Sequence, residues 1–141
     1  MKVVINTCYG GFELSDEAIE MVMNRKGYGC YRYRRTKSSF DYEGVSEYTK
    51  CDKFSKNDLF THYLKEDLGD KINNIPNNVY WHYGNLERND SDLVAVVEEL
   101  GDKANGQFSK LKIVEVPDDI NWEIDDYDGI ESIHEVHRTW Y

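Results

Sequence analysis

Hydrophobic positions follow a strand pattern and then a helix pattern at the start of this 141-residue chain. The continuous β-branched run Val3–Ile5 predicts a short buried strand, since a strand covered on both faces is apolar throughout. Ser15 is a favourable helix N-cap, and Gly27 is a typical residue at a helix end. Between them, the apolar residues recur at helical spacing and predict one buried helix face. They are Ala18, Ile19, Val22 and Met23.

The same order of patterns returns in the second half of the chain. Val79–Tyr83 predicts a strand, Asp90 and Gly101 bracket an amphipathic helix, and Leu111–Val116 predicts another strand. Asp128-Gly129 is a strong hairpin signal. Beyond it, Ile130 to Tyr141 fits a partner strand or a helix, and we favour the strand.

The middle of the chain carries weaker patterns. Cys30–Arg35 predicts a strand with Tyr31, Tyr33 and Arg35 on one face, and Phe60–Leu64 predicts another strand. Residues 36–60 show no clear period. The whole pattern predicts a single domain, 1–141, of the α+β class. It has a mixed or mostly antiparallel sheet, about two main helices packed on the sheet, and a C-terminal hairpin.

Charge and composition narrow the expected partners and location. The net charge of -10 argues against duplex nucleic acid as a partner, although Tyr31–Lys37 forms a local basic run. No stretch approaches the ~20 apolar residues of a membrane span, so we expect no membrane partner. The three cysteines lack the spacing of a disulfide framework, which favours a reducing, cytoplasmic location.

The polar loop between the first strand and the first helix is the main candidate site. Backbone N–H groups at a glycine turn before a helix can hold an anion, and glycine lets a ligand approach closely. The loop does not match the phosphate-binding patterns G-x-G-x-x-G or G-x-x-x-x-G-K-[ST]. A simple tight turn therefore remains the alternative. The candidate loop residues are Asn6, Thr7, Cys8, Tyr9, Gly10 and Gly11.

Four arginines complete the predicted ligand site. A guanidinium can grip a phosphate with two hydrogen bonds, and nearby aromatic rings can stack on a base. The alternative for Arg88 is an ion pair with Glu87 or Asp90. The predicted ligand-binding arginines are Arg32, Arg34, Arg35 and Arg88.

The sequence predicts no catalytic residue, no metal ligand and no cofactor. Cys8 lacks the arginine of the Cys-x5-Arg phosphatase loop, and we expect it to be a buried, inert thiol. His134 and His137 could ligate a metal together on a helix, but on a strand they face opposite sides. The acidic run Glu123–Asp128 does not match a calcium-binding loop.

Four segments carry a resemblance to a known family. They are V-I-N-T-C-Y-G-G-F-x-L-S, N-D-x-D-L-V-x-V-V-E-E-L-G, A-N-G-x-x-x-x-L-K-I-V-E-V-P-D-D and W-E-I-D-D-Y-D-G-I-E…H-R-T-W. In these the chain resembles a family of small proteins encoded by bacteriophages and prophages. The resemblance covers both ends and not the middle, about 38–78, and brings no catalytic residues. It implies a phage accessory protein in the bacterial cytoplasm.

Three functional hypotheses remain. The first is an oligomeric counter-defence protein that binds and sequesters a small nucleotide-like anion. The second is a protein-binding inhibitor of a host defence enzyme, acting through the acidic surface or the aromatic residues. The third is a small nucleotide-processing enzyme that uses Cys8, Asn6 or a histidine. The surroundings of the glycine loop, the arginines and Cys8 distinguish these hypotheses.

Overall fold

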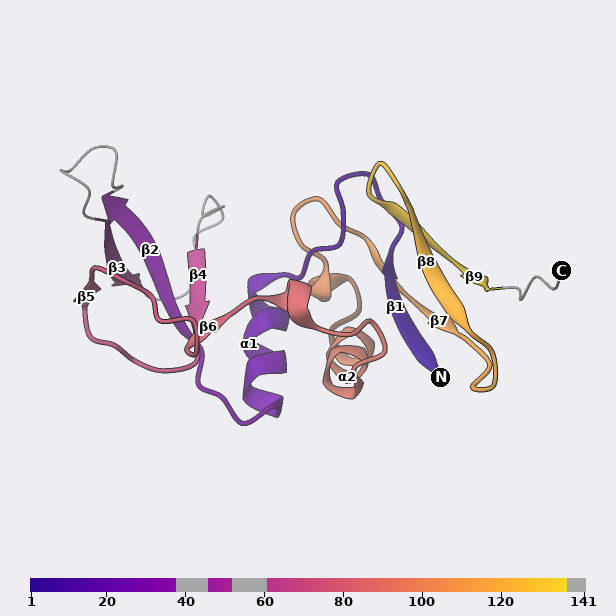
Figure 1. Ribbon diagram of the computed structural model, residues 1–141, viewed down its shortest axis with the longest axis horizontal. Coiled ribbons are helices and arrows are strands. Elements are labelled where there is room, and N and C mark those ends of the chain that lie inside the picture. Colours follow the sequence, from indigo (N-terminus) through magenta and orange to yellow (C-terminus); the bar gives the residue numbers. More distant parts are fainter. Residues whose placement is uncertain (38–45, 52–60, 137–141) are drawn as a thin grey trace, which may run out of the picture. The chain divides into compact units, whose positions relative to one another are not determined.

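The computed structural model describes residues 1–37, 46–51 and 61–136 (Figure 1). These residues form helices and antiparallel strands, which confirms the predicted α+β class and the C-terminal hairpin. The chain separates into two compact units, Met1–Val22 with Tyr83–Tyr141, and Met23–His82. In sequence, the second unit is an insertion in the first. The prediction of a single domain stays a prediction.

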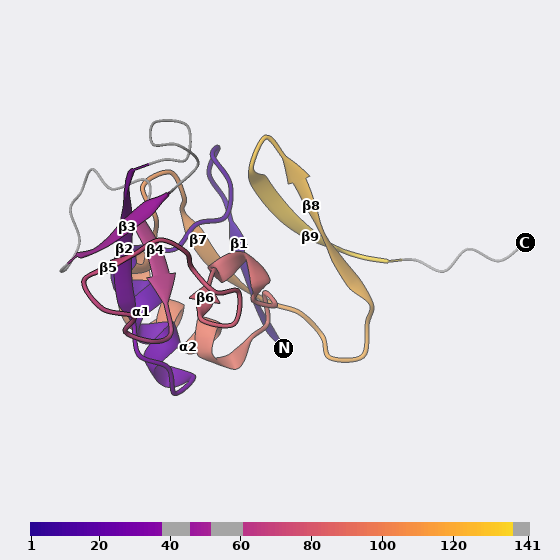
Figure 2. The same cartoon turned by 60° about the vertical axis from the view of Figure 1, so that its left-hand side comes forward.

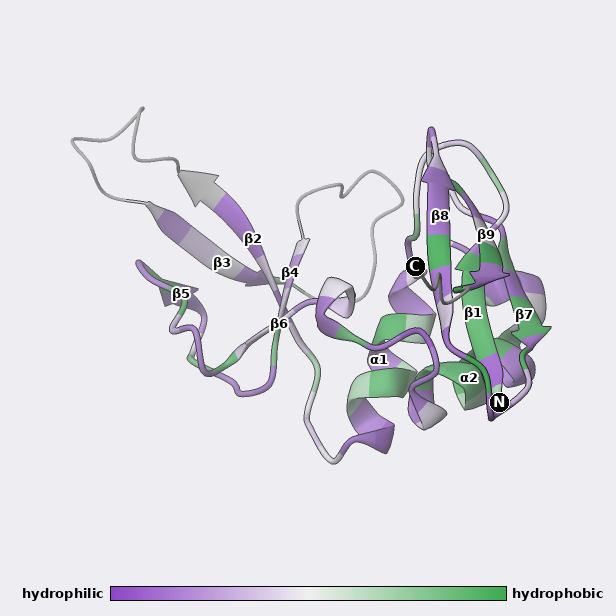
Figure 3. Cartoon of the chain, turned by 45° about the vertical axis from the view of Figure 1, so that its right-hand side comes forward, coloured by the Kyte–Doolittle hydropathy of each residue, from purple (hydrophilic) through white to green (hydrophobic). Residues whose placement is uncertain are grey.

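The first unit is built around the buried strand β1 (Lys2–Asn6). β1 pairs antiparallel with β7 (Leu111–Glu115), with Val4 opposite Ile113. Val3 and Ile5 pack with Val116 on one side, against apolar residues of the C-terminal hairpin. The helix α2 (Ser91–Leu100) also contacts β1. Apolar residues therefore run continuously along β1, as Figure 3 shows by its green colour.

The helices begin and end as their capping residues predict. Helix α1 (Asp16–Arg25) begins where Ser15 Oγ accepts a hydrogen bond of 3.1 Å from the Ala18 N–H. At α2, Asp90 Oδ1 accepts from the N–H groups of Asp92 and Leu93 at 2.9 and 3.0 Å. Short 3-10 helices lie before α2 at η1 (Tyr83–Asn85) and after it at η2 (Gly101–Ala104). No helix in the described segments has the length and apolar character needed to cross a membrane.

The hairpin of β8 (Trp122–Tyr127) and β9 (Ile130–Glu135) completes the first unit (Figure 2). Asp128 and Gly129 both have positive φ, +52° and +90°, as a type I′ turn requires. One face of the hairpin carries Trp122, Ile124 and Ile133 and packs against the β1 core. The other face carries polar residues, in line with the predicted half-buried strand.

The second unit is a five-stranded antiparallel sheet in the order β5-β3-β2-β4-β6. At its centre, the Tyr33 side chain is fully buried, and its hydroxyl donates to the Gly69 carbonyl at 2.7 Å. Tyr33 packs with Leu64 and Val79. The strands are β2 (Tyr31–Lys37), β3 (Glu47–Cys51), β4 (Thr61–Leu64), β5 (Lys71–Ile72) and β6 (Tyr80–Trp81).

Several strand predictions differ from the structure in their extent. The partner strand predicted over Ile130–Tyr141 is present as Ile130–Glu135, and residues 137–141 lie outside the described part of the chain. The strand predicted over Val79–Tyr83 is reduced to Tyr80–Trp81, because a 3-10 helix begins at Tyr83. The strand predicted over Phe60–Leu64 is present from Thr61, and Phe60 lies outside the described residues.

Candidate functional site at the glycine loop

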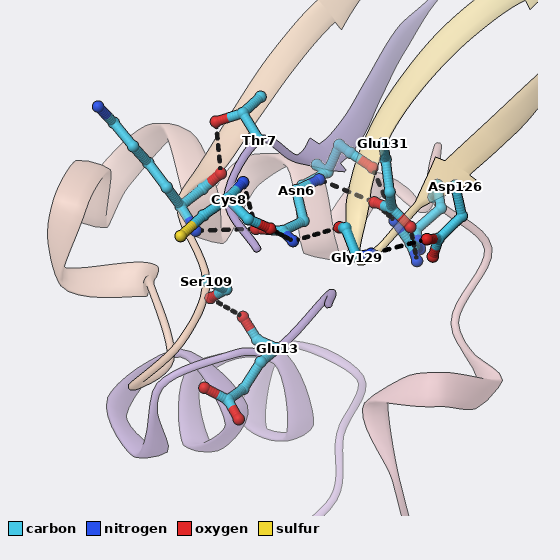
Figure 4. Close-up of polar contacts among 11 residues, drawn as sticks. Asn6, Thr7, Cys8, Glu13, Ser109, Asp126, Gly129 and Glu131 are labelled. Atoms are coloured by element: carbon cyan, nitrogen blue, oxygen red, sulfur yellow. Dashed lines mark hydrogen bonds and ion pairs between the residues drawn. The ribbon is translucent and has the colours of Figure 1, made fainter. Parts of the chain in front are cut away.

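Asn6 ends β1 with a side chain that is fully buried and fully hydrogen-bonded (Figure 4). Its Nδ2 donates to the carbonyl oxygens of Cys8 and Gly129, both at 2.6 Å. Its Oδ1 accepts from the N–H groups of Lys110 at 2.9 Å and Cys8 at 3.3 Å. A primary amide offers two donors and two acceptor sites, so every one is used. Asn6 therefore joins its own loop to β7 and to the hairpin turn.

The carboxylate of Glu131 lies beside Asn6, on the edge of β1 that faces away from β7. The Asn6 N–H donates to Glu131 Oε1 at 2.8 Å. Arg88 donates to the same carboxylate through Nη1 and Nη2 at 2.6 and 2.8 Å. The Arg88 backbone carbonyl accepts from the Val4 N–H at 2.8 Å. Arg88 and Glu131 thus accept hydrogen bonds from the outward-facing N–H groups of β1, and their opposite charges neutralise each other.

The arginine of this pair also stacks on an aromatic ring. The Arg88 guanidinium carbon lies 3.6 Å from the centre of the Phe12 ring. The Arg88 side chain is 22% exposed and the Glu131 side chain 5% exposed. Arg88 therefore pairs with Glu131 rather than with Glu87 or Asp90, and its charge already has a buried partner.

Gly10 and Gly11 pack against the hairpin turn. A Cβ added to Gly129 would lie 2.4 Å from the Gly11 nitrogen and 2.7 Å from the Gly10 nitrogen. A Cβ added to Gly10 would lie 2.6 Å from the Phe108 carbonyl oxygen. The two glycines also have positive φ, +127° and +102°. The loop therefore needs glycine for its backbone conformation and for its close packing against the hairpin turn. Both requirements are those of a tight turn.

A third segment, residues 105–110, is fixed to the same loop by Glu13. The Glu13 carbonyl accepts from Ser109 Oγ at 2.7 Å, and Glu13 Oε1 accepts from the Phe108 N–H at 2.9 Å. Thr7 Oγ1 also donates to the Lys110 carbonyl at 2.9 Å. Three loops therefore meet at one hydrogen-bonded junction, which we call the loop junction: residues 6–13, 105–110 and 128–131.

Three large aromatic side chains remain exposed around the loop junction. Tyr9 is 64% exposed, Phe108 53% and Tyr127 74%. Each belongs to one of the three segments or directly adjoins it.

The Cys8 side chain, which the sequence predicted to be buried, is half-buried. Its Sγ lies 3.4 Å from the carbonyl oxygen of Tyr9, and a carbonyl oxygen is not a base that could activate the thiol.

The remaining predicted arginines lie on β2 in the second unit and alternate between its two faces. Arg32 is buried, and its guanidinium carbon lies 5.8 Å from the centre of the Tyr63 ring. Arg35 is exposed, and its guanidinium carbon lies 5.6 Å from the ring centre of Tyr48, the residue opposite Arg35 on β3. Arg34 shares the face of Arg32. Their participation in a site with the glycine loop stays a prediction.

Aromatic and imidazole rings gather beside Arg35. His62 lies between Tyr48 and Tyr80, with ring centres 5.5 and 6.1 Å apart. Burial lowers the pKa of His62, and the charge of Arg35 lowers it further. The pKa of His82 is also lowered, by burial. These rings favour the neutral imidazole at neutral pH.

Glu131 is the site residue that sequence reasoning missed. The sequence did contain a signal for this residue. In a hairpin, Glu131 lies on the same face as the apolar residue Ile133, and burial of an unpaired carboxylate on that face would cost free energy. Such a position indicates a buried partner, which is Arg88. No protein-family model, curated protein or solved structure matches this chain, and the site rests on its own geometry.

Proposed function

We propose that this chain is a phage accessory protein that binds a protein of the bacterial host through the surface formed by Tyr9, Phe108 and Tyr127. The observation that carries this proposal is the exposure of all three aromatic rings around one hydrogen-bonded junction. Exposed aromatic rings lose little conformational entropy on binding and are enriched in protein interfaces. We call this set the aromatic surface.

The charge around the aromatic surface indicates the kind of partner. Asp126 and Asp128 are exposed beside Tyr127, and the chain as a whole carries a net charge of -10. Opposite potentials speed association and reject partners of like charge. The proposed partner therefore presents an apolar contact ringed by lysine and arginine. Inhibition of a host defence enzyme in the cytoplasm is the role that this fits.

Sequestration of a small anion at the glycine loop is less well supported. Asn6 and Arg88 both have internal partners, so an anion there would compete with Glu131 for the same guanidinium. A shallow open depression of about 350 Å³ on this unit lies at the other end of β1. It is lined by Met1, Lys2, Asn89, Ser91, Val94, Ala95 and Glu98.

One observation favours a nucleotide-like ligand elsewhere, as a second candidate. The exposed Arg35 and the rings of Tyr48, His62 and Tyr80 form a cationic, aromatic group on the sheet of the second unit. Arginine can bind a phosphate while an aromatic ring stacks on a base. Native mass spectrometry of the protein expressed in bacteria tests this candidate and the expected homo-oligomer together, since it detects both a retained small molecule and the subunit number.

Affinity capture from a bacterial lysate, followed by titration with the purified partner, tests the lead proposal. The test variant is Tyr9→Ala/Phe108→Ala/Tyr127→Ala. The control is Tyr28→Ala/Tyr80→Ala, which removes exposed tyrosines of the second unit. We expect the test variant to lose roughly 30-fold or more in affinity, as for about 2 kcal/mol at a binding hot spot, and the control to bind like the wild type. A partner bound equally by both variants would contradict the proposal.

A further inference from the structure

The outward face of the C-terminal hairpin brings three metal-binding side chains together. Glu123 and Asp125 alternate along β8, so they share a face. His134 on β9 is the direct cross-strand neighbour of Glu123. This face is opposite the one that packs Trp122 and Ile124 against the core.

The imidazole of His134 lies between the two carboxylates. Its Nε2 is 2.7 Å from Glu123 Oε1, and its Nδ1 is 2.5 Å from Asp125 Oδ2. One ligand atom from each residue lies within 4.8 Å of the others. Nδ1 is buried, and its contact with Asp125 does not have the geometry of a hydrogen bond.

Two carboxylates on one imidazole favour a bound cation. A neutral imidazole has one N–H, so it can donate to one carboxylate only and then faces the other with a lone pair. A metal ion bound by one ring nitrogen removes that repulsion once the carboxylate at the other ring nitrogen turns toward the ion, because all three groups then direct lone pairs at the ion. A second proton on the ring is the competing solution.

We propose that Glu123, Asp125 and His134 form a binding site for a divalent transition metal ion of the Zn²⁺ type. An imidazole with two carboxylates is a nitrogen and oxygen donor set that suits Zn²⁺, Co²⁺ or Mn²⁺ rather than Ca²⁺. Two ligands at about 2.1 Å from a tetrahedral ion stand about 3.4 Å apart. An ion bound at one ring nitrogen needs the present carboxylate contact of that nitrogen to open by less than about 1 Å. The ligand atom of the other carboxylate, now within 4.8 Å, needs to move closer, and exposed side chains achieve both changes by small rotations.

The charge of the hairpin favours a bound cation. Between Trp122 and Glu135 the sequence contains six acidic residues and no lysine or arginine. Glu131 is already paired with Arg88, and a divalent ion would reduce the repulsion between Glu123 and Asp125 and the other unpaired acids. It would also cross-link β8 to β9 at the end of the hairpin that is remote from the Asp128-Gly129 turn. Binding is therefore expected to stabilise the pairing of the two strands.

Isothermal titration of Zn²⁺ into the full, untagged chain tests the site. The variant His134→Asn removes the imidazole ligand, and Asp125→Asn removes a carboxylate ligand at constant side-chain size. Glu135→Gln is the matched control, since it removes a charge from the same strand at a position on the other face. We expect each ligand variant to weaken binding at least about tenfold, and the control to change it less than about threefold. Equal loss in the control would show diffuse attraction to the acids and overturn the site.

Co²⁺ absorption separates this site from the cysteines. Cys8, Cys30 and Cys51 are not in disulfides, and thiolates are also ligands for transition metals. A nitrogen and oxygen site gives a Co²⁺ spectrum without thiolate-to-metal charge transfer, and His134→Asn should abolish that spectrum. A thiolate band that persists in His134→Asn would place the metal on cysteine. Absence of saturable binding in the wild type would likewise overturn the proposal.

Discussion

Arg88 and Glu131 form a bidentate ion pair in which the carboxylate also accepts a hydrogen bond from the backbone N–H of Asn6. The pair acts in place of a neighbouring strand at the outer edge of β1. Val4 donates to the Arg88 carbonyl and Asn6 donates to the Glu131 carboxylate. The strand edge is thereby closed by one side chain and one backbone group from distant parts of the sequence.

Replacing Arg88 by methionine should destabilise the fold more than replacing Glu131 by glutamine. Arg88→Met leaves a buried carboxylate without its cation, and we expect a loss of about 3 kcal/mol in the free energy of unfolding. Glu131→Gln keeps an acceptor for Asn6 and should cost less. Urea unfolding followed by tryptophan fluorescence measures both, and Glu135→Gln is the exposed control on the same strand. Equal small losses in all three variants would show that the pair contributes little.

Asn6→Asp should be strongly destabilising although it preserves the side-chain shape. The new carboxylate would face the carbonyl oxygens of Cys8 and Gly129, to which Asn6 now donates. We expect a loss of about 2–4 kcal/mol, since two buried hydrogen bonds become repulsive contacts. Asn77→Asp, at an exposed position, is the control and should stay within about 0.5 kcal/mol of the wild type. A tolerated Asn6→Asp would show that the amide network is not maintained in solution.

Gly129→Ala and Gly11→Ala separate steric from conformational requirements at the loop junction. Both positions have positive φ, +90° and +102°, so alanine is strained at each by about 1 kcal/mol. Only the Cβ at Gly129 would meet backbone atoms, at 2.4 Å, whereas the Cβ at Gly11 meets nothing within 4 Å. We expect Gly129→Ala to lower the melting temperature clearly more than Gly11→Ala. Similar melting temperatures would contradict the close packing of turn and loop.

Acidification should destabilise the second unit at mildly acidic pH. Burial lowers the pKa of His62 and His82 below 6.5, so the unfolded chain binds protons that the folded chain does not. The free energy of unfolding therefore falls as the pH drops below about 6.5. Asp67, whose pKa is lowered by its hydrogen bond from Lys50, loses its contribution only at more acidic pH.

Nuclear magnetic resonance of the imidazole protons measures this effect directly. His62 and His82 should titrate below the range of an unfolded histidine, and His62→Gln should flatten the pH dependence of stability between about pH 7 and pH 5. An unchanged slope in His62→Gln, together with ordinary titration of both rings, would contradict the burial of these side chains.

The local elements of the fold could be predicted from sequence because their signals are local. Ser15 and Asp90 cap their helices with their own side chains, and Asp128-Gly129 supplies the positive φ values of its turn. The pairing of β1 with β7 could not be predicted. Strands close to each other in sequence are the usual partners, and the choice of a distant partner depends on which apolar faces pack together.

The candidate site shows the same limit. The sequence indicates that Asn6 is a polar residue at a strand end. Its partners, however, come from β7 and from the hairpin, which only the folded chain brings near. Arg88 was expected to face a ligand, and its partner Glu131 lies 43 positions further along the sequence. A buried charge implies that an opposite charge lies nearby, but the periodicity of the sequence does not identify the residue that supplies it.

The pairing of β1 with β7 also has a consequence for folding during synthesis. Lys2 is opposite Glu115, so the apolar strand β1 leaves the ribosome long before its partner exists. At the usual rates of translation, the remaining ~110 residues take on the order of 5–20 s. During this interval, β1 exposes Val3, Val4 and Ile5 without a strand to cover them. We therefore expect the folding rate to be limited by this late, long-range closure.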